Sequence, residues 1–297
     1  MKSGFVALIG RPNVGKSTLL NRLVGTKVSI VSDKPQTTRN RILGVRTDPE
    51  SQIIFLDTPG IHRPGYRLNE RMMDDVYEVI SEVDVVVHLV DASEKFGKGE
   101  SFVLDMMKAA EKPTILLLNK IDLINKGKVL PLIEFYNETE AYDEIIPVSA
   151  LNGSNTDRLL DVILTYLPDG DMLYPDDYLT DRHERFMVAE LIREKVLAKA
   201  RQELPYSTAV QVEEFDESQR EDGFVRITAS IIVDRPGQKK IVVGKGGQFI
   251  KEIGIAARKE IEELLDVRKI YLALNVKVVE GWRDREYLLD DLGFNRN

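Results

Sequence analysis

The sequence of 297 residues contains no cysteine and only three histidines. Without cysteine the chain can form neither a disulfide bond nor a thiolate metal site, and the scattered histidines lack zinc-ligand spacing. Any metal ion that the chain binds is therefore expected to be a hard cation held by oxygen atoms.

Long apolar runs are also missing, because none approaches the roughly 20 residues that a membrane-spanning helix needs. The first residues run straight into a short apolar stretch, without the apolar segment and cleavage site of a secretory signal. With 43% hydrophobic and 30% charged residues, the composition is typical of a soluble globular protein. We expect a cytoplasmic protein.

A net positive charge is absent as well, since the formal net charge is -8. This argues against a protein that binds polyanions over its whole surface. Net charge averages over faces that can differ, so a nucleic-acid site has to be sought locally.

The length predicts two domains, because single cores usually divide at about 250 to 300 residues. Residues 1–168 alternate short apolar runs, typical of strands buried on both faces, with helical patterns. The predicted strands are 5–9, 53–56, 83–90, 114–118 and 145–148, and the predicted helices are 18–24, 68–83, 101–110 and 156–167. This pattern favours an α/β domain with a mostly parallel sheet and helices on both faces.

A predicted linker, residues 169–181, contains one proline and five aspartates and shows little periodicity. The predicted second domain, residues 182–297, is a smaller α+β unit with a C-terminal tail. Its helices are expected at 184–201 and, broken at glycines, at 238–265, and its strands at 207–215, 224–233 and 269–279. This order implies an antiparallel or mixed sheet with helices on one face.

The first motif, Gly10 to Ser17, matches G-x-x-x-x-G-K-[ST] between a predicted strand and a predicted helix. Glycine lets consecutive N–H groups point at phosphate oxygens, and the helix N-terminus adds a favourable dipole. Lys16 is expected to bridge the outer phosphates, and Ser17 to give its hydroxyl to Mg²⁺. The predicted phosphate-binding residues are Gly10, Arg11, Pro12, Asn13, Val14, Gly15, Lys16, Ser17 and Thr18.

A second motif, Asp57-Thr58-Pro59-Gly60, follows the strand predicted at 53–56. Ligands of open α/β sheets bind at the carboxyl ends of strands, where the phosphate loop also opens. Asp57 is therefore expected on the Mg²⁺ side, through water, and the Gly60 N–H near the terminal phosphate.

A third motif, Asn119-Lys120-Ile121-Asp122, predicts selection of guanine over adenine. The Asp122 carboxylate can accept two hydrogen bonds from the guanine N1–H and N2–H₂ edge, where adenine has no matching donor pair. Asn119 is expected to brace the loop, and the stem of Lys120 to pack on the ring. After another predicted strand, Ser149-Ala150 is expected to supply a backbone N–H to the guanine carbonyl.

These four elements, in this order, resemble the translation-factor-related GTPases over residues 5 to 168. The resemblance implies that Thr37 and Thr38 lie in the first switch loop. Thr38 is the preferred Mg²⁺ ligand, although the sequence alone leaves the one-residue register open. Lys16, Thr38, Gly60 and Asn13 are the residues expected to act in catalysis.

Ile61 stands where Ras-like GTPases have a water-positioning glutamine, and an apolar side chain cannot orient a nucleophilic water. The chain resembles the GTPases with a hydrophobic residue at this position, in which another group must complete the site. Asn13 matches an asparagine associated there with K⁺, which could supply positive charge to the reaction. The alternative is that Asn13 only braces its loop.

The predicted second domain carries Gly244-Lys245-Gly246-Gly247 between its last two helical patterns. Such a G-x-x-G turn clamps nucleotides by close approach of its backbone. From residue 239 to 259 there are six positive groups and one negative group, a local balance of +5. We predict RNA contacts from Lys239, Lys240, Gly244, Lys245, Gly246, Gly247 and Lys251. The alternative is a helix cap with a solvated lysine face.

The predicted second domain resembles the bacterial-type (type II) KH domain. A GTPase domain followed by such a domain, together with segments 178–182, 203–207 and 235–240, resembles a family of bacterial GTPases of small-ribosomal-subunit assembly. The resemblance implies a monomeric molecular switch with a low intrinsic rate of GTP hydrolysis to GDP and phosphate, and with Mg²⁺ as cofactor and K⁺ as a further candidate. It also implies binding of the 3′ end of small-subunit ribosomal RNA.

Several alternatives stay open at this point. The chain could be an RNA-binding module in which GTP hydrolysis is incidental. It could also be a GTPase that works on tRNA or at a membrane, with the KH-like unit as scaffold. The sequence does not decide whether the basic face also touches anionic lipid at the cytoplasmic side of the inner membrane.

Overall fold

The computed structural model describes residues 1–297 except 35, 62–64, 200–203 and 295–297. Contacts between Cα atoms divide the chain into two units. The first comprises residues 1–31, 38–64 and 69–181, and the second comprises 32–37, 65–68 and 182–297. The domain boundaries 168 and 182 inferred from the sequence stay a prediction.

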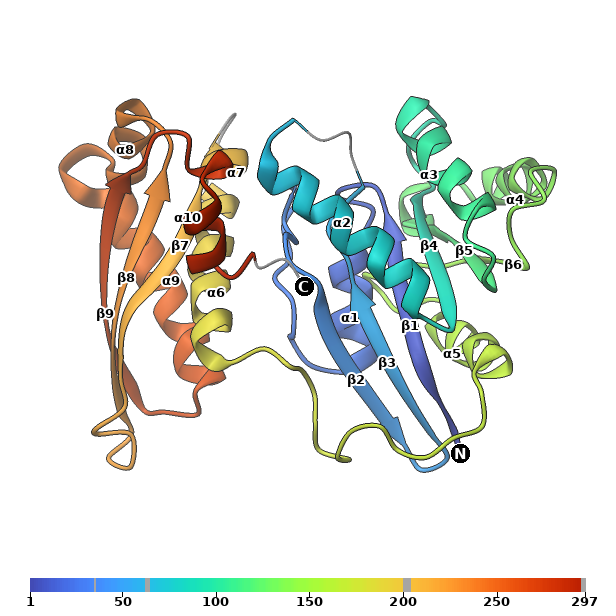
Figure 1. The fold of residues 1–297 in the computed structure, drawn as a ribbon, viewed down its shortest axis with the longest axis horizontal. Coiled ribbons are helices and arrows are strands. Elements are labelled where there is room, and N and C mark those ends of the chain that lie inside the picture. Colours follow the sequence, from blue (N-terminus) through green and yellow to red (C-terminus); the bar gives the residue numbers. More distant parts are fainter. Residues whose placement is uncertain (35, 62–64, 200–203, 295–297) are drawn as a thin grey trace. The chain divides into compact units, whose positions relative to one another are not determined.

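The first unit is built on a six-stranded sheet in the order β2-β3-β1-β4-β5-β6 (Figure 1). All neighbouring strands are parallel except β2 and β3, which pair antiparallel. The strands are β1 (Lys2–Gly10), β2 (Ile42–Asp48), β3 (Ser51–Asp57), β4 (Val85–Asp91), β5 (Thr114–Asn119) and β6 (Glu144–Pro147).

Helices cover both faces of this sheet, as predicted. They are α1 (Lys16–Val24), α2 (Arg67–Glu82), α3 (Lys98–Lys108), α4 (Val129–Asn137) and α5 (Thr156–Tyr166), with short 3-10 turns η1 (Ile121–Leu123) and η2 (Lys126–Lys128). One core cluster joins Ala7 of β1 to Val76 of α2 and Val103 of α3. Helix α1 packs on the other face, against β1, β2 and β3 (Figure 1).

Two elements of the first unit, β2 and α4, are absent from the sequence-based prediction. Strand β2 is an edge strand that begins buried and ends half-exposed and charged, so it lacks the continuous apolar run of its neighbours. Helix α4 contains Pro131, and its apolar residues are not confined to one face: Leu132, Ile133 and Tyr136 pack against the core, whereas Leu130 and Phe135 are exposed.

The segment 169–181 forms no helix and no strand of its own, but it lies along the first unit. Gly170 N donates to Met1 O over 2.9 Å, and Val45 N of β2 donates to Leu179 O over 2.9 Å. The side chain of Gln52 accepts hydrogen bonds from the backbone N–H groups of Leu173 and Tyr174. This segment is therefore hydrogen-bonded to the sheet edge.

The second unit has a three-stranded mixed sheet in the order β7-β8-β9, antiparallel between β7 and β8 and parallel between β8 and β9. The strands are β7 (Ala209–Asp216), β8 (Phe224–Val233) and β9 (Lys269–Val278). The helices are α6 (Glu184–Lys199), α7 (Leu204–Ser207), α8 (Pro236–Val243), α9 (Gln248–Leu264) and α10 (Glu286–Asp291), with 3-10 turns η3 (Lys245–Gly247) and η4 (Trp282–Asp284).

The predicted α-β-β-α-α-β order is confirmed, with the short α7 and α10 added. Residues 200 and 201 of the predicted first helix, and Glu203 of a quoted segment, lie outside the described residues. Along β8 and β9, Val225 and Ile270 are buried while Arg226 and Tyr271 are exposed, so at this end of the strands one sheet face is packed and the other is open. No helix in the described ranges is long and apolar enough to cross a membrane.

Candidate nucleotide and RNA sites

The phosphate loop connects β1 to α1, which begins at Lys16. Gly15 has φ +102°, and a Cβ there would lie 2.4 Å from Nδ2 of Asn119. A side chain would therefore strain the backbone and displace the guanine loop, which explains the second glycine of the motif.

Lys16 is buried, and its ammonium donates to the carbonyl oxygens of Gly10 (3.0 Å) and Arg11 (3.1 Å). Burial lowers the pKa of Lys16 to about 8, against the opposing charge of Asp57. The ammonium is thus held inside the loop that it is predicted to complete, and an ammonium group has a third N–H that can donate to a phosphate.

Ser17, Thr38 and Asp57, the three residues predicted to face Mg²⁺, converge. Ser17 Oγ donates to Asp57 Oδ2 over 2.7 Å, Thr38 Oγ1 lies 3.3 Å from the same oxygen, and the two hydroxyl oxygens are 2.8 Å apart. The sequence separates the first and last of these residues by 40 positions. Three oxygen-bearing side chains therefore meet at the carboxyl end of β3.

The Asp57 carboxylate fits a hard cation. It is fully buried, and its Oδ1 has no hydrogen-bond partner among the described residues. Burial raises the pKa of Asp57, although Lys16 and the hydroxyls of Ser17, Ser29 and Thr38 oppose the shift. A buried, unpartnered carboxylate oxygen is costly unless a cation or donor satisfies it, so the donor set suits Mg²⁺.

The two threonines of the first switch loop differ in placement. Thr38 Oγ1 points to Ser17 and Asp57, whereas Thr37 Oγ1 donates to the carbonyl oxygen of Lys34 over 2.6 Å. Thr38 is therefore the better placed of the two, and its role as a ligand stays a prediction.

Gly60 and Ile61 lie against the phosphate loop. A Cβ on Gly60 would come within 2.8 Å of the Pro12 backbone, and Ile61 N donates to Gly10 O over 3.1 Å. The Ile61 side chain is only 3% exposed and packs into the core with Met73 and Val76. It is thus turned into the core, which adds a second reason why it cannot position a water.

Asn13, the residue predicted to hold K⁺, is exposed and has a left-handed backbone with φ 65°. Asparagine adopts this conformation more readily than most residues. The strained, exposed position is compatible with either role of Asn13, as cation ligand or as a brace of the loop.

The guanine motif is bound to the phosphate loop. Asn119 is 1% exposed; its Nδ2 donates to Val14 O over 2.7 Å, and its Oδ1 accepts from Ala150 N over 2.9 Å. Ser149 Oγ donates to Asp122 Oδ1 over 2.5 Å. The loop residues predicted to read guanine therefore form one hydrogen-bonded group.

Arg22 of α1 is a residue that sequence reasoning missed. Its Nε donates to Ala150 O over 2.7 Å and its Nη2 to Leu151 O over 2.5 Å, from 128 and 129 positions away. No local pattern could have indicated a contact of that range. The helix that begins the phosphate site thus also supports the loop of Ser149 and Ala150.

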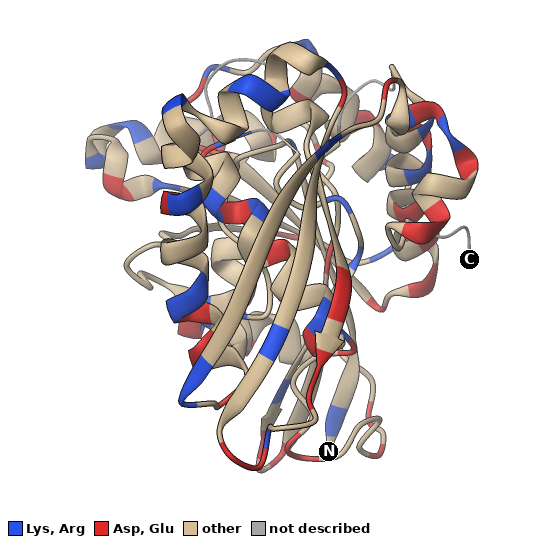
Figure 2. Cartoon of the chain, turned by 90° about the vertical axis from the view of Figure 1, so that its left-hand side faces the viewer, with Lys and Arg blue, Asp and Glu red and all other residues tan. Residues whose placement is uncertain are grey.

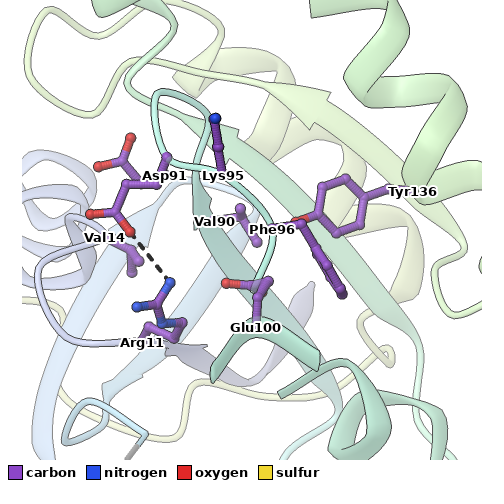
Figure 3. Close-up of a pocket in the computed structure, with 9 residues that line it drawn as sticks. Arg11, Val14, Val90, Asp91, Lys95, Phe96, Glu100 and Tyr136 are labelled. Carbon is purple, nitrogen blue, oxygen red and sulfur yellow. Dashed lines mark hydrogen bonds and ion pairs between the residues drawn. The ribbon is translucent and has the colours of Figure 1, made fainter. Parts of the chain in front are cut away.

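Arg11 extends from the phosphate loop toward the turn after β4. It lines a small pocket with Asp91 and Tyr136, and its Nη1 is ion-paired with Glu94 Oε2 at 3.3 Å (Figure 3). Asp91 had a detectable signal, because it is a carboxylate at the end of a predicted strand, as Asp57 is.

In the second unit, the turn of Gly244 to Gly247 joins α8 to α9. Gly244, Gly246 and Gly247 all have positive φ, at 74°, 61° and 77°, and a Cβ on Gly246 would meet no heavy atom within 4 Å. The backbone at Gly246 is therefore open to a ligand, and the left-handed conformations explain the glycines.

The lysines predicted to contact RNA, at positions 239, 240, 245 and 251, are all exposed. Figure 2 shows Lys and Arg interspersed with Asp and Glu over the chain, so the positive balance of residues 239–259 is a local feature. In the described parts of the chain, no cluster of three or more His, Asp or Glu residues could hold a metal ion.

Comparison with known proteins agrees with this arrangement. A family described as 50S ribosome-binding GTPase matches residues 5–120, and a KH domain family matches residues 203–283. A crystal structure of Era in complex with MgGDPNP and nucleotides 1506–1542 of 16S ribosomal RNA is 44% identical over 100% of both chains, with a TM-score of 0.95. The chain belongs to the Era family.

A second Era structure leads to the same conclusion. It is a singly substituted Era of Aquifex aeolicus bound to GDP·AlF₄⁻, 44% identical over 100% of both chains, with a TM-score of 0.94. The Era fold, a GTPase domain followed by a KH domain, is therefore the fold of this chain.

Proposed function

We propose that this chain is a GTP-hydrolysing switch that binds the 3′ end of small-subunit ribosomal RNA during maturation of the small subunit. The observation that carries the proposal is the convergence of Ser17, Thr38 and Asp57 beside a guanine loop that is hydrogen-bonded to the phosphate loop. The Era structures with a GTP analogue and ribosomal RNA, and with GDP·AlF₄⁻, support it.

The residues of the nucleotide site have separate roles. Backbone N–H groups of Gly10 to Thr18 cradle the phosphates, and Lys16, anchored on two carbonyl oxygens of the loop, donates to phosphate oxygens. Ser17 and Thr38 would hold Mg²⁺, with Asp57 on the same side through water, and the ion would supply charge stabilisation to the transferring phosphoryl group. Asp122 accepts from the guanine edge, and Asn119 fixes the loop that carries it.

Because Ile61 is buried, the protein supplies no side chain there to orient water, and we propose that K⁺ at Asn13 completes the charge around the phosphates. GTP turnover should be faster in K⁺ buffer than in Na⁺ buffer, and Asn13→Ala should remove the difference. Equal turnover in the two buffers would eliminate the K⁺ proposal and leave the rest intact.

The RNA function rests on the open backbone at Gly246. Gly246→Asp would add a carboxylate to this open turn, where it would repel RNA phosphates, so it should abolish binding of an rRNA 3′-end oligonucleotide while GDP still binds. Gly127→Asp, in the 3-10 turn η2 of the first unit, is the control and should bind the RNA normally. Retained affinity in Gly246→Asp would refute the proposed RNA contact at this turn.

A second candidate function is an RNA-binding module whose hydrolysis is incidental. Single-turnover hydrolysis with and without the rRNA oligonucleotide or small subunits separates the two. The switch requires RNA to change the turnover rate or the nucleotide affinity, whereas the module predicts identical rates.

Two finer points concern location and assembly. We propose a cytoplasmic monomer whose exposed lysines at 239, 240 and 245 also contact anionic lipid at the inner membrane. The protein should sediment with phosphatidylglycerol vesicles and not with phosphatidylcholine vesicles. Light scattering should give the mass of one 33.7 kDa chain.

A further inference from the structure

The turn that follows β4, residues 91–97, lies between the phosphate loop and the guanine loop. Asp91 is paired in register with Asn119 of β5, and Ala92 N donates to Asn119 O over 2.9 Å. Asp91 and Arg11 line the same pocket (Figure 3). The turn is thus fixed to the strand end from which the guanine motif starts.

The Asp91 carboxylate is almost fully engaged. Its side chain is 8% exposed, and Oδ2 is 2.6 Å from the ammonium of Lys120. Oδ1 accepts from the backbone N–H of Ser93 over 2.9 Å and from Ser93 Oγ over 2.6 Å. Because the turn itself holds one oxygen, the other is aimed at Lys120 in a fixed direction.

Lys120 is therefore held at both ends. Its backbone is left-handed, with φ 63°, directly after the buried Asn119, and its ammonium is held by Asp91. The stem between these points cannot rotate freely. A free lysine side chain would lose much rotamer freedom on packing against a ligand, so prior ordering favours binding.

We propose that Asp91 is a positioning residue of the guanine site, which holds the stem of Lys120 in the place where it covers the base. This inference rests on the proposed function, because it assumes that Asn119 to Asp122 bind guanine. Asp91 acts through Lys120, and Ser93 orients Asp91. The ion pair also neutralises the ammonium, so Lys120 contributes its apolar stem rather than its charge.

The competing explanation is that Asp91 only stabilises its own turn through Ser93. A purely structural carboxylate would change the unfolding temperature and would affect nucleotide binding independently of Lys120. A positioning residue instead loses its effect once Lys120 has no ammonium to hold. A double-mutant cycle separates these roles.

The experiment measures the dissociation rate constant and Kd of a fluorescent GDP for four proteins: wild type, Asp91→Asn, Lys120→Met and the double variant. Asp91→Asn should raise Kd for GDP and for GTP by the same factor, about tenfold, mainly through faster dissociation. At saturating GTP, kcat should be unchanged while KM rises. In the Lys120→Met background, Asp91→Asn should cause no further increase in Kd or in the dissociation rate constant.

Asp105→Asn, an exposed aspartate of α3, is the matched control and should behave as wild type. Ser93→Ala keeps both charges but removes one donor to Asp91, so it should give a smaller increase in GDP dissociation. If Asp91→Asn does not fold, Ser93→Ala tests the same proposal.

An unchanged Kd in Asp91→Asn, with normal thermal unfolding, would overturn the proposal. The proposal would also be overturned if Asp91→Asn raised the Kd for GDP by the same factor in wild type and in the Lys120→Met background. If wild type itself did not bind GDP, the proposed function would fail first, so the two failures are distinguishable.

Discussion

Nδ2 of Asn119 donates a hydrogen bond of 2.7 Å to the carbonyl oxygen of Val14, across 105 positions of sequence. The same side chain accepts from Ala150 N, so one buried amide joins three loops of the nucleotide site. Disturbance of this amide should therefore affect phosphate and base recognition together.

Asn119→Ala should destabilise the first unit even without nucleotide. Two buried groups, Val14 O and Ala150 N, would lose their partner, at a cost of about 1–3 kcal/mol each. Urea unfolding of the nucleotide-free protein measures this cost. Asn137→Ala, at an exposed position ending α4, is the control. Equal stability of the Asn119 variant and wild type would contradict the prediction.

Ile61→Gln should not restore a water-positioning glutamine. The Ile61 side chain is 3% exposed within the core cluster, so the new amide would be buried among apolar groups, at a cost of about 1–3 kcal/mol. We expect a lower unfolding temperature and no faster GTP hydrolysis at saturating substrate. A gain in kcat would show that the side chain can turn toward the phosphates.

The ion pair of Asp91 predicts a pH dependence. Burial alone would raise the pKa of Asp91, but the hydrogen bonds from Lys120 and Ser93 and the charge of Lys120 outweigh it and lower the pKa. A lowered carboxyl pKa contributes stability above the unfolded value of about 3.9, and this stability is lost as pH falls through the folded pKa.

Wild type should therefore exceed Asp91→Asn in stability by a constant amount from pH 5 to 8, and the gap should close at more acid pH. Unfolding by urea at a series of pH values measures the gap. A difference in stability between wild type and Asp91→Asn that grows as the pH falls would contradict the prediction.

Trp282→Ala should strongly destabilise the second unit. Trp282 is fully buried, and its Nε1 donates to Ser207 O over 2.9 Å. Loss of the side chain should cost about 3–5 kcal/mol, and Trp282→Phe should cost less because the ring volume is mostly kept. Unfolding is followed by circular dichroism, since this is the only tryptophan of the chain. Similar losses for the two variants would point to the hydrogen bond rather than to packing.

Sequence patterns were sufficient to predict those features that depend on neighbouring residues alone. Buried parallel strands gave apolar runs, and polar residues such as Asp57 followed directly at strand ends. The order of elements in the second unit was also predicted from the sequence, because the spacing of its apolar residues differs between the helical segments and the strands. These features are local, so they can be inferred before any tertiary structure is known.

Features that depend on distant parts of the chain could not be inferred. Arg22 reaches Ala150 O across 128 positions, and nothing near Arg22 indicates that partner. The register of Thr37 and Thr38 is equally a matter of tertiary geometry, because both are threonines in one loop. That the Ile61 side chain is buried could only be seen once α2 had been placed against β1 and β3.

The hydrogen bond from Val45 N to Leu179 O has a consequence for solubility. Strand β2 is the outer strand of its sheet, and unpaired N–H groups on such a strand can template association with another chain. The irregular segment 169–181 occupies this position and protects it. A fragment that ended at residue 168 would expose the strand to self-association, so an isolated first unit should be cut after residue 181.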